Sequence, residues 1–155
     1  METIKLDGRE FRGITQSLSA RQDDFILVEL RQSGAMEILA ALPKDATPAQ
    51  RDAASDAMFN KILDSGRKYR LLAGLLTEEG KTWTHGAADR NAERFGDITD
   101  TDEKVTMSRE LMRLVVLFFR FGAESSTTSP NSSSQSDAAP STGSAAVETS
   151  ATSRP

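Results

Sequence analysis

The composition of the chain changes abruptly at Ala123, and this change limits the part of the 155 residues that can form a packed core. From Ala123 onward about half of the residues are Ser or Thr, no aromatic residue occurs, and Val147 is the only large aliphatic one. Such a segment buries too little apolar surface to offset the entropy lost on ordering. We therefore expect one folded domain over residues 1–122 and a disordered Ser/Thr-rich tail over residues 123–155.

The N-terminal segment predicts a β-hairpin. Asp7-Gly8 is typical of a type I′ turn, because both central positions of that turn need positive φ. A two-residue loop fixes the register, and the pairs predicted to lie opposite each other are Leu6 and Arg9, Lys5 and Glu10, and Ile4 and Phe11. The apolar side chains then share one face, which we expect to pack on the helices that follow.

Helical signals dominate the rest of the domain. Two capping boxes, Ser19 to Gln22 and Thr47 to Gln50, each precede apolar residues at helical spacing. The predicted fold class is therefore mainly α, a small helical domain with an N-terminal β-hairpin.

Glycine and proline divide the predicted helices. Ser33-Gly34 and Ser65-Gly66 are expected to interrupt them, and Pro43 is expected to end one. Gly80 is predicted to stop the helix that precedes it. Trp83 is placed in the short connection that leads to the next helix.

The last predicted helix runs roughly from Asp102 to Phe121. Carboxylates over residues 97–103 precede it, where they suit the positive end of the helix dipole. Its predicted apolar stripe comprises Val105, Ser108, Leu111 or Met112, Val115, and Phe118 or Phe119.

The composition excludes several kinds of chemistry. There is no cysteine, so disulfides, cysteine zinc sites and thiol catalysis are absent. The net charge of −4, with basic residues scattered among acidic ones, argues against nucleic acid as a partner. The N-terminus lacks the apolar core of a signal peptide, and the run from Leu114 to Phe119 is too short to cross a membrane. We expect a soluble intracellular protein.

No catalytic, cofactor-binding or metal-binding residues are predicted. His85 is the single histidine, and we expect it to be an exposed residue at the start of a short helix. The acidic residues 97–103 lack the central glycine and the final glutamate of a calcium loop, so helix capping is the simpler interpretation. No nucleophile elbow or phosphate-binding glycine loop is present, and we expect no enzymatic activity.

The apolar end of the last predicted helix is the strongest functional signal. From Leu114 to Phe121 it is apolar on nearly every face, although one buried stripe would suffice for packing. Either this helix is central and surrounded by others, or it forms a surface for a partner or a second copy. For the second alternative the predicted protein-binding residues are Trp83, Leu117, Phe118, Phe119 and Phe121.

Over roughly residues 1–135 the layout resembles the tail assembly chaperones of long-tailed bacteriophages. The similarity lies in the opening hairpin of residues 3–11, the compact helical body, residues 75–84 leading into residues 91–95, and a closing helix ending in Leu117-Phe118-Phe119 before the tail.

The resemblance implies a chaperone without catalytic activity. Its implied partners are the tape measure protein and the tail tube protein, and its implied location is the cytoplasm of the host cell, with absence from the mature virion. A structural tail or head-tail component, or an unrelated small helical adaptor, are the alternatives. Self-association is left open.

Overall fold

A computed structural model describes the backbone of residues 2–138 and the side chains of residues 2–122. Within these residues the elements are β1 (Thr3–Leu6), β2 (Arg9–Gly13), α1 (Ala20–Ser33), α2 (Ala35–Ala41), α3 (Pro48–Asp64), α4 (Lys68–Leu75), β3 (Leu76–Glu78), α5 (His85–Gly96) and α6 (Thr101–Ala138). The predicted class, a mainly α fold with an N-terminal hairpin, is confirmed. Residues 1–117 form one compact unit, and α6 from Phe118 onward belongs to a second unit.

The predicted hairpin is confirmed together with its register. Strands β1 and β2 are antiparallel, with Leu6 opposite Arg9 and Ile4 opposite Phe11. Asp7 and Gly8 have φ values of 53° and 73°, which the mirror-image turn requires. A residue of α6 also stabilises the turn, because the N–H of Asp7 donates to Oε2 of Glu103 at 2.6 Å.

A third strand lies where the sequence predicted only helix. Helix α4 ends at Leu75, and β3 follows at once and pairs antiparallel with β2, with Phe11 opposite Glu78. The prediction that Gly80 stops a helix is therefore wrong. Gly80 has a φ of 79° and lies in the turn after β3. Pairing with β2 overrides the helical preference of the leucines, since it satisfies backbone groups on the open edge of the hairpin.

The two predicted capping boxes form to different extents. At α3 the box is complete, with Gln50 N–H donating to Thr47 Oγ1 and Gln50 Oε1 accepting from the N–H of Thr47. At α1 only half of it forms. Ser19 Oγ accepts from the N–H of Gln22, but the Gln22 side chain is buried and donates to the carbonyl of Gly74 at 2.8 Å. Gln22 thereby joins α1 to α4.

The predicted breaks between helices are confirmed. Gly34 takes the left-handed conformation, with φ of 89°, and separates α1 from α2. Residues 65–67 separate α3 from α4, and Pro43 lies just beyond the end of α2.

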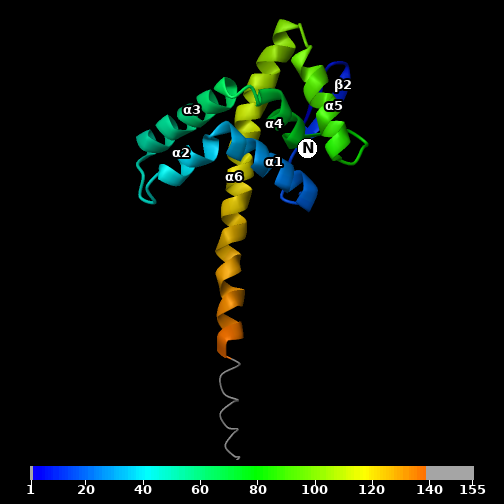
Figure 1. Ribbon diagram of the computed structural model, residues 1–155. Helices are drawn as coiled ribbons and strands as arrows, with labels where there is room; N and C mark the ends of the chain where they lie inside the picture. Colours follow the sequence, from blue (N-terminus) through cyan, green and yellow to red (C-terminus); the bar gives the residue numbers. More distant parts are fainter. Residues whose placement is uncertain (1, 139–155) are drawn as a thin grey trace, which may run out of the picture. The chain divides into compact units, whose positions relative to one another are not determined.

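Helices α2 and α3 pack side by side and both contact α1, which also contacts α4 and α5 (Figure 1). Helices α4 and α5 pack against each other, and β3 continues directly from α4 into the sheet. The largest fully buried side chains come from the hairpin, α1, α3, α4, β3, α5 and α6: Leu6, Phe11, Ile26, Leu30, Ile62, Leu71, Leu72, Leu75, Leu76, Phe95, Met107 and Leu111.

Helix α6 begins as predicted but buries a different stripe. Asp100 accepts from the N–H of Glu103, so the acidic segment caps the helix as expected. Val105 was predicted to be buried and is 59% exposed, which makes that part of the stripe wrong. The buried residues of α6 within the first unit are Met107, Glu110, Leu111, Leu114 and Val115. Leu114 packs against Gly13 of β2, in space that a Cβ at Gly13 would fill.

The backbone of α6 continues to Ala138, beyond the predicted end at Phe121. Gly122 lowers helix propensity without blocking the backbone hydrogen bonds, so it need not end a helix. The predicted division at residues 122 and 123 stays a prediction. Of the expected disordered tail, residues 139–155 lie outside the described residues.

Candidate protein-binding surface

Large apolar side chains remain exposed at a few positions of the first unit. They are Val28, Leu63, Val105, Met112 and Val116, each at least 40% exposed. A single exposed apolar residue is ordinary, but a group of them on neighbouring helices is typical of an interaction surface. Met112 and Val116, both on α6, line one groove together with less exposed residues of α3.

A shallow apolar groove of about 30 Å³ lies between α3 and the part of α6 that belongs to the first unit. Its lining, named here the α3–α6 groove, comprises Ser55, Met58, Phe59, Ile62, Met112, Val115 and Val116. Met58, Ile62 and Val115 are buried and form its floor, whereas Met112 and Val116 are 40% and 46% exposed. The groove thus has an apolar floor and one exposed apolar wall.

Helical spacing explains why the exposed residues of α6 align. Val105, Met112 and Val116 are separated by seven and four positions, and such intervals return to the same face of a helix. Phe59 and Leu63 on α3 are likewise four positions apart. A partner helix with apolar residues at the same intervals could therefore lie along these helices. The flexible and exposed Met112 side chain suits partners of varied shape.

Trp83, one of the predicted binding residues, lies in the connection between β3 and α5, as expected. Its indole N–H donates to the carbonyl of Ala73 at 3.2 Å, and its ring packs edge-to-face on Phe25 at 5.4 Å between centroids. Trp83 lines a cavity of about 260 Å³ beside the start of α1, away from the residues of the α3–α6 groove. Its contacts are those of a residue that attaches the connection to α1 and α4.

The other predicted binding residues lie near the boundary of the two units. Leu117, the last residue of the first unit, is half-buried. In the second unit Phe118 is buried, Phe119 and Phe121 are half-buried, and the rings of Phe118 and Phe119 pack edge-to-face at 5.9 Å. That these residues bind a partner stays a prediction.

A cluster of ion pairs in the first unit joins three helices. Glu29 on α1 is 3% exposed, and its carboxylate accepts from Arg67 at 2.8 Å and from Arg70 at 2.9 Å. Arg70 also donates to Asp89 of α5 at 2.9 Å. The hydrogen bond to Glu29 raises the pKa of the Arg70 guanidinium, against the opposing effect of its partial burial. The cluster could not be found from the sequence, because its members come from separate helices.

No group of residues in the described part of the chain has the arrangement of a metal site. His85 is exposed at the first turn of α5, as predicted, and its Nδ1 lies 3.3 Å from the carboxylate of Asp89. Within the same residues, no helix combines the length and the apolar character needed to cross a bilayer.

Comparison of the chain with protein-family models, with curated proteins and with solved structures gave no significant match. The surface geometry and the sequence resemblance therefore provide the basis for a functional proposal.

Proposed function

We propose that the protein is a tail assembly chaperone of a long-tailed bacteriophage, which binds apolar helical segments of the tape measure protein and the tail tube protein during assembly. The observation that carries the proposal is the α3–α6 groove, where Met112 and Val116 leave an apolar helix face uncovered. A tape measure protein is a long helical chain with apolar stripes, and such a stripe could lie over the exposed Met112 and Val116 side chains. The sequence resemblance supplies the phage context.

The geometry favours reversible binding. Fully burying one aliphatic side chain contributes about 1.5–3 kcal/mol, and Met112 and Val116 are already partly covered. A partner that covers both gains a few kcal/mol before the cost of association is subtracted. Weak binding repeated along a long partner suits a chaperone that must leave when the tube closes.

The first test is co-expression with the tail tube and tape measure proteins encoded near the gene, followed by purification of complexes. Val116→Asp is expected to remain folded by circular dichroism and to lose the tape measure protein. Val28→Asp is the matched control, since Val28 is 41% exposed on α1 and lies outside the groove. Equal binding by both variants would show that the groove is not the site.

The predicted residues at the end of the apolar run need a separate test. At least one of the variants Phe119→Asp and Phe121→Asp is expected to keep the fold and to weaken partner binding or self-association. If both variants unfold the domain, Phe119 and Phe121 contribute to the packing of the fold and do not form the binding surface. The binding assay with Val116→Asp then remains the test of the chaperone proposal.

A structural component of the tail is the competing function. The two are distinguished by mass spectrometry of purified virions, because a chaperone is absent from the finished particle and a structural component is present in many copies. Detection at the copy number of a tail protein would overturn the chaperone proposal.

A further inference from the structure

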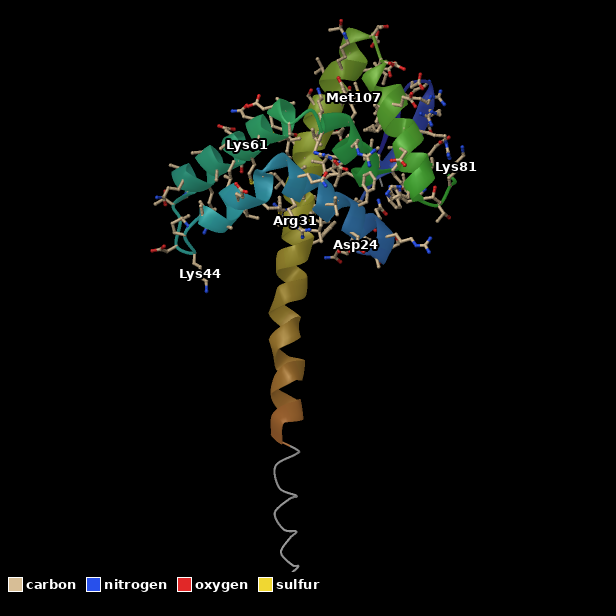
Figure 2. The ribbon with its side chains drawn as sticks, in the orientation of Figure 1. Asp24, Arg31, Lys44, Lys61, Lys81 and Met107 are labelled. Carbon is tan, nitrogen blue, oxygen red and sulfur yellow. The ribbon has the colours of Figure 1, made fainter. Side chains whose placement is uncertain are left out.

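A second cavity lies between the sheet and α5, and four of its seven lining residues are basic. It has a volume of about 190 Å³, and its lining residues are Arg9 from β2, Glu78 from β3, Lys81 from the turn that follows, and Ala87, Arg90, Asn91 and Arg94 from α5. We name it the basic pocket. Figure 2 shows Lys81 in the loop beside α5. None of these residues belongs to the α3–α6 groove.

Local structure brings the basic residues together. Arg9 and Phe11 are two positions apart on β2 and so point to the same face of the sheet, where Phe11 packs edge-to-face on Phe95 of α5. On α5, residues 87, 90, 91 and 94 recur at intervals of three and four and share one helix face. The packing of Phe11 on Phe95 therefore sets Arg9 opposite Arg90 and Arg94.

The basic side chains of the pocket outnumber the carboxylates that lie in it or beside it. Four cationic side chains line it, and two carboxylates accompany them: Glu78 in the lining and Asp7 beside it. Asp7 lies 2.7 Å from Arg94 and 3.6 Å from Arg9. The excess is two positive charges, on a chain whose net charge is −4.

Stability of the fold does not account for this excess. Arg90 and Arg94 are four positions apart on α5, and like charges at that spacing destabilise a helix, although the ion pair of Arg94 with Asp7 reduces this repulsion. Arg90 is exposed and forms no ion pair with any residue in the described part of the chain. A ligand with negative charge would offset the repulsion.

Arg9 has unused hydrogen-bonding capacity at this place. Its Nη1 donates to Glu78 and to Asn91, at 3.1 Å and 2.9 Å. Its Nε and Nη2 are shielded from water and have no hydrogen-bond acceptor among the described residues. These two nitrogens form the edge of a guanidinium that holds an oxyanion by two parallel hydrogen bonds. Arg9 therefore has two donors beyond the one that Glu78 and Asn91 use.

We infer that the basic pocket binds a phosphate group. A phosphate group carries a charge of about −1.5 to −2 at neutral pH, which matches the two excess positive charges. Its oxygens accept from several guanidinium groups at once, whereas a single carboxylate presents only two oxygens. The group is either free phosphate or a phosphate monoester. This inference is independent of the proposed chaperone function.

The test is a titration of the full chain with inorganic phosphate, followed by amide chemical shifts in nuclear magnetic resonance at constant ionic strength. Saturable shifts are expected at Lys81, Arg90 and Asn91. Arg90→Gln should bind phosphate about tenfold more weakly, the effect of losing one charge-assisted contact. Arg51→Gln is the matched control, because Arg51 is exposed on α3 and lies outside the pocket, and its affinity should be unchanged.

Two further ligands show which kind of anionic group the pocket binds. Phosphoserine binding at least as tightly as inorganic phosphate would assign the site to a phosphate carried on an organic molecule, and weaker binding would assign it to free phosphate. Succinate carries a similar charge on two carboxylates and should bind more weakly than either.

Three results would overturn the inference: shifts that chloride reproduces at the same ionic strength, equal affinity for succinate and phosphate, or equal weakening by Arg90→Gln and Arg51→Gln. Circular dichroism shows whether Arg90→Gln is folded. If it is not, Lys81→Gln replaces it, since Lys81 is also exposed and also lines the basic pocket.

Discussion

The carboxylate of Glu29 on α1 lies 2.9 Å from Nε of Arg70 on α4, and Glu29 is one of the least exposed charged residues of the domain. Arg70 also lies over the ring of Phe25, with its central guanidinium carbon 5.1 Å from the ring centroid. Together with its ion pair to Asp89, these contacts make Arg70 the side chain that joins α1, α4 and α5.

Replacing Arg70 should therefore destabilise the domain measurably. Arg70→Met keeps much of the aliphatic volume but leaves the buried Glu29 carboxylate with Arg67 as its remaining partner. Breaking a fully buried pair costs about 3–5 kcal/mol, and because Arg70 is partly exposed we expect about 2 kcal/mol. Urea denaturation measures the loss. Arg51→Met, at an exposed position, should change stability by less than about 0.5 kcal/mol.

Gly74 is expected to tolerate no side chain, although it lies in a helix. A Cβ at Gly74 would be 2.8 Å from the ring of Phe25 and 3.2 Å from Ile26. Alanine gains up to about 1 kcal/mol in helix propensity, but overpacking a core costs about 1–3 kcal/mol, so the net effect of Gly74→Ala should be a loss.

Gly86→Ala provides the comparison for Gly74→Ala. A Cβ at Gly86 would meet only the end of the flexible Arg90 side chain, at 3.4 Å. We expect the thermal midpoint of this variant to be unchanged or raised. A rise for both variants would mean that the core around Phe25 adapts to an added methyl group.

The elements that could be predicted from the sequence are those with local determinants. The Asp7-Gly8 turn fixes its own φ values and the register of β1 and β2, and the Thr47 capping box needs only residues of its own helix turn. Strand β3 could not be predicted in this way. Its three residues continue a leucine-rich helix, and only pairing with β2, more than sixty positions away, makes them a strand.

The candidate sites likewise could be predicted only where their residues are close together in the sequence. The predicted binding residues were mainly those of one continuous apolar run, because a run is visible in sequence. The α3–α6 groove and the basic pocket each combine residues from separate elements, such as Arg9 on β2 with Arg90 on α5. The exposure of Val105 was missed for a related reason: the face of α6 that is buried depends on contacts with elements far away in the sequence, such as the contact of Leu114 with Gly13.

The turn between β1 and β2 gives a prediction about backbone conformation. Gly8 has a φ of 73°, and a Cβ at this position would meet no atom within 4 Å, so only the backbone resists substitution there. Gly8→Val should cost on the order of 1 kcal/mol or more, because a β-branched residue resists positive φ. Gly8→Asn should be close to neutral, since asparagine tolerates that conformation. If thermal denaturation showed the same loss of stability for both variants, the cause would be steric and not the conformation of the backbone.

Glu78 links stability to pH. Its carboxylate accepts from Lys81 at 3.0 Å and from Arg9 at 3.1 Å, and the hydrogen bond from Lys81 is the main cause that lowers the pKa of Glu78 in the folded state. A carboxyl group whose folded pKa lies below its unfolded value, about 4.3, binds its proton more readily in the unfolded chain. Its contribution to stability is therefore complete above the unfolded pKa and is lost as the pH falls through the folded pKa.

Glu78→Gln should consequently be less stable than the parent chain at pH 7, by less than about 1 kcal/mol because the group is partly exposed, and the difference should shrink as the pH falls below about 4. Glu93→Gln serves as the reference, since Glu93 is exposed on α5 and forms no ion pair with the described residues. Urea midpoints at a series of pH values measure both. A Glu78→Gln difference that persists unchanged at low pH would mean that the side-chain amide, rather than the lost charge, disturbs the contact with Arg9 and Lys81.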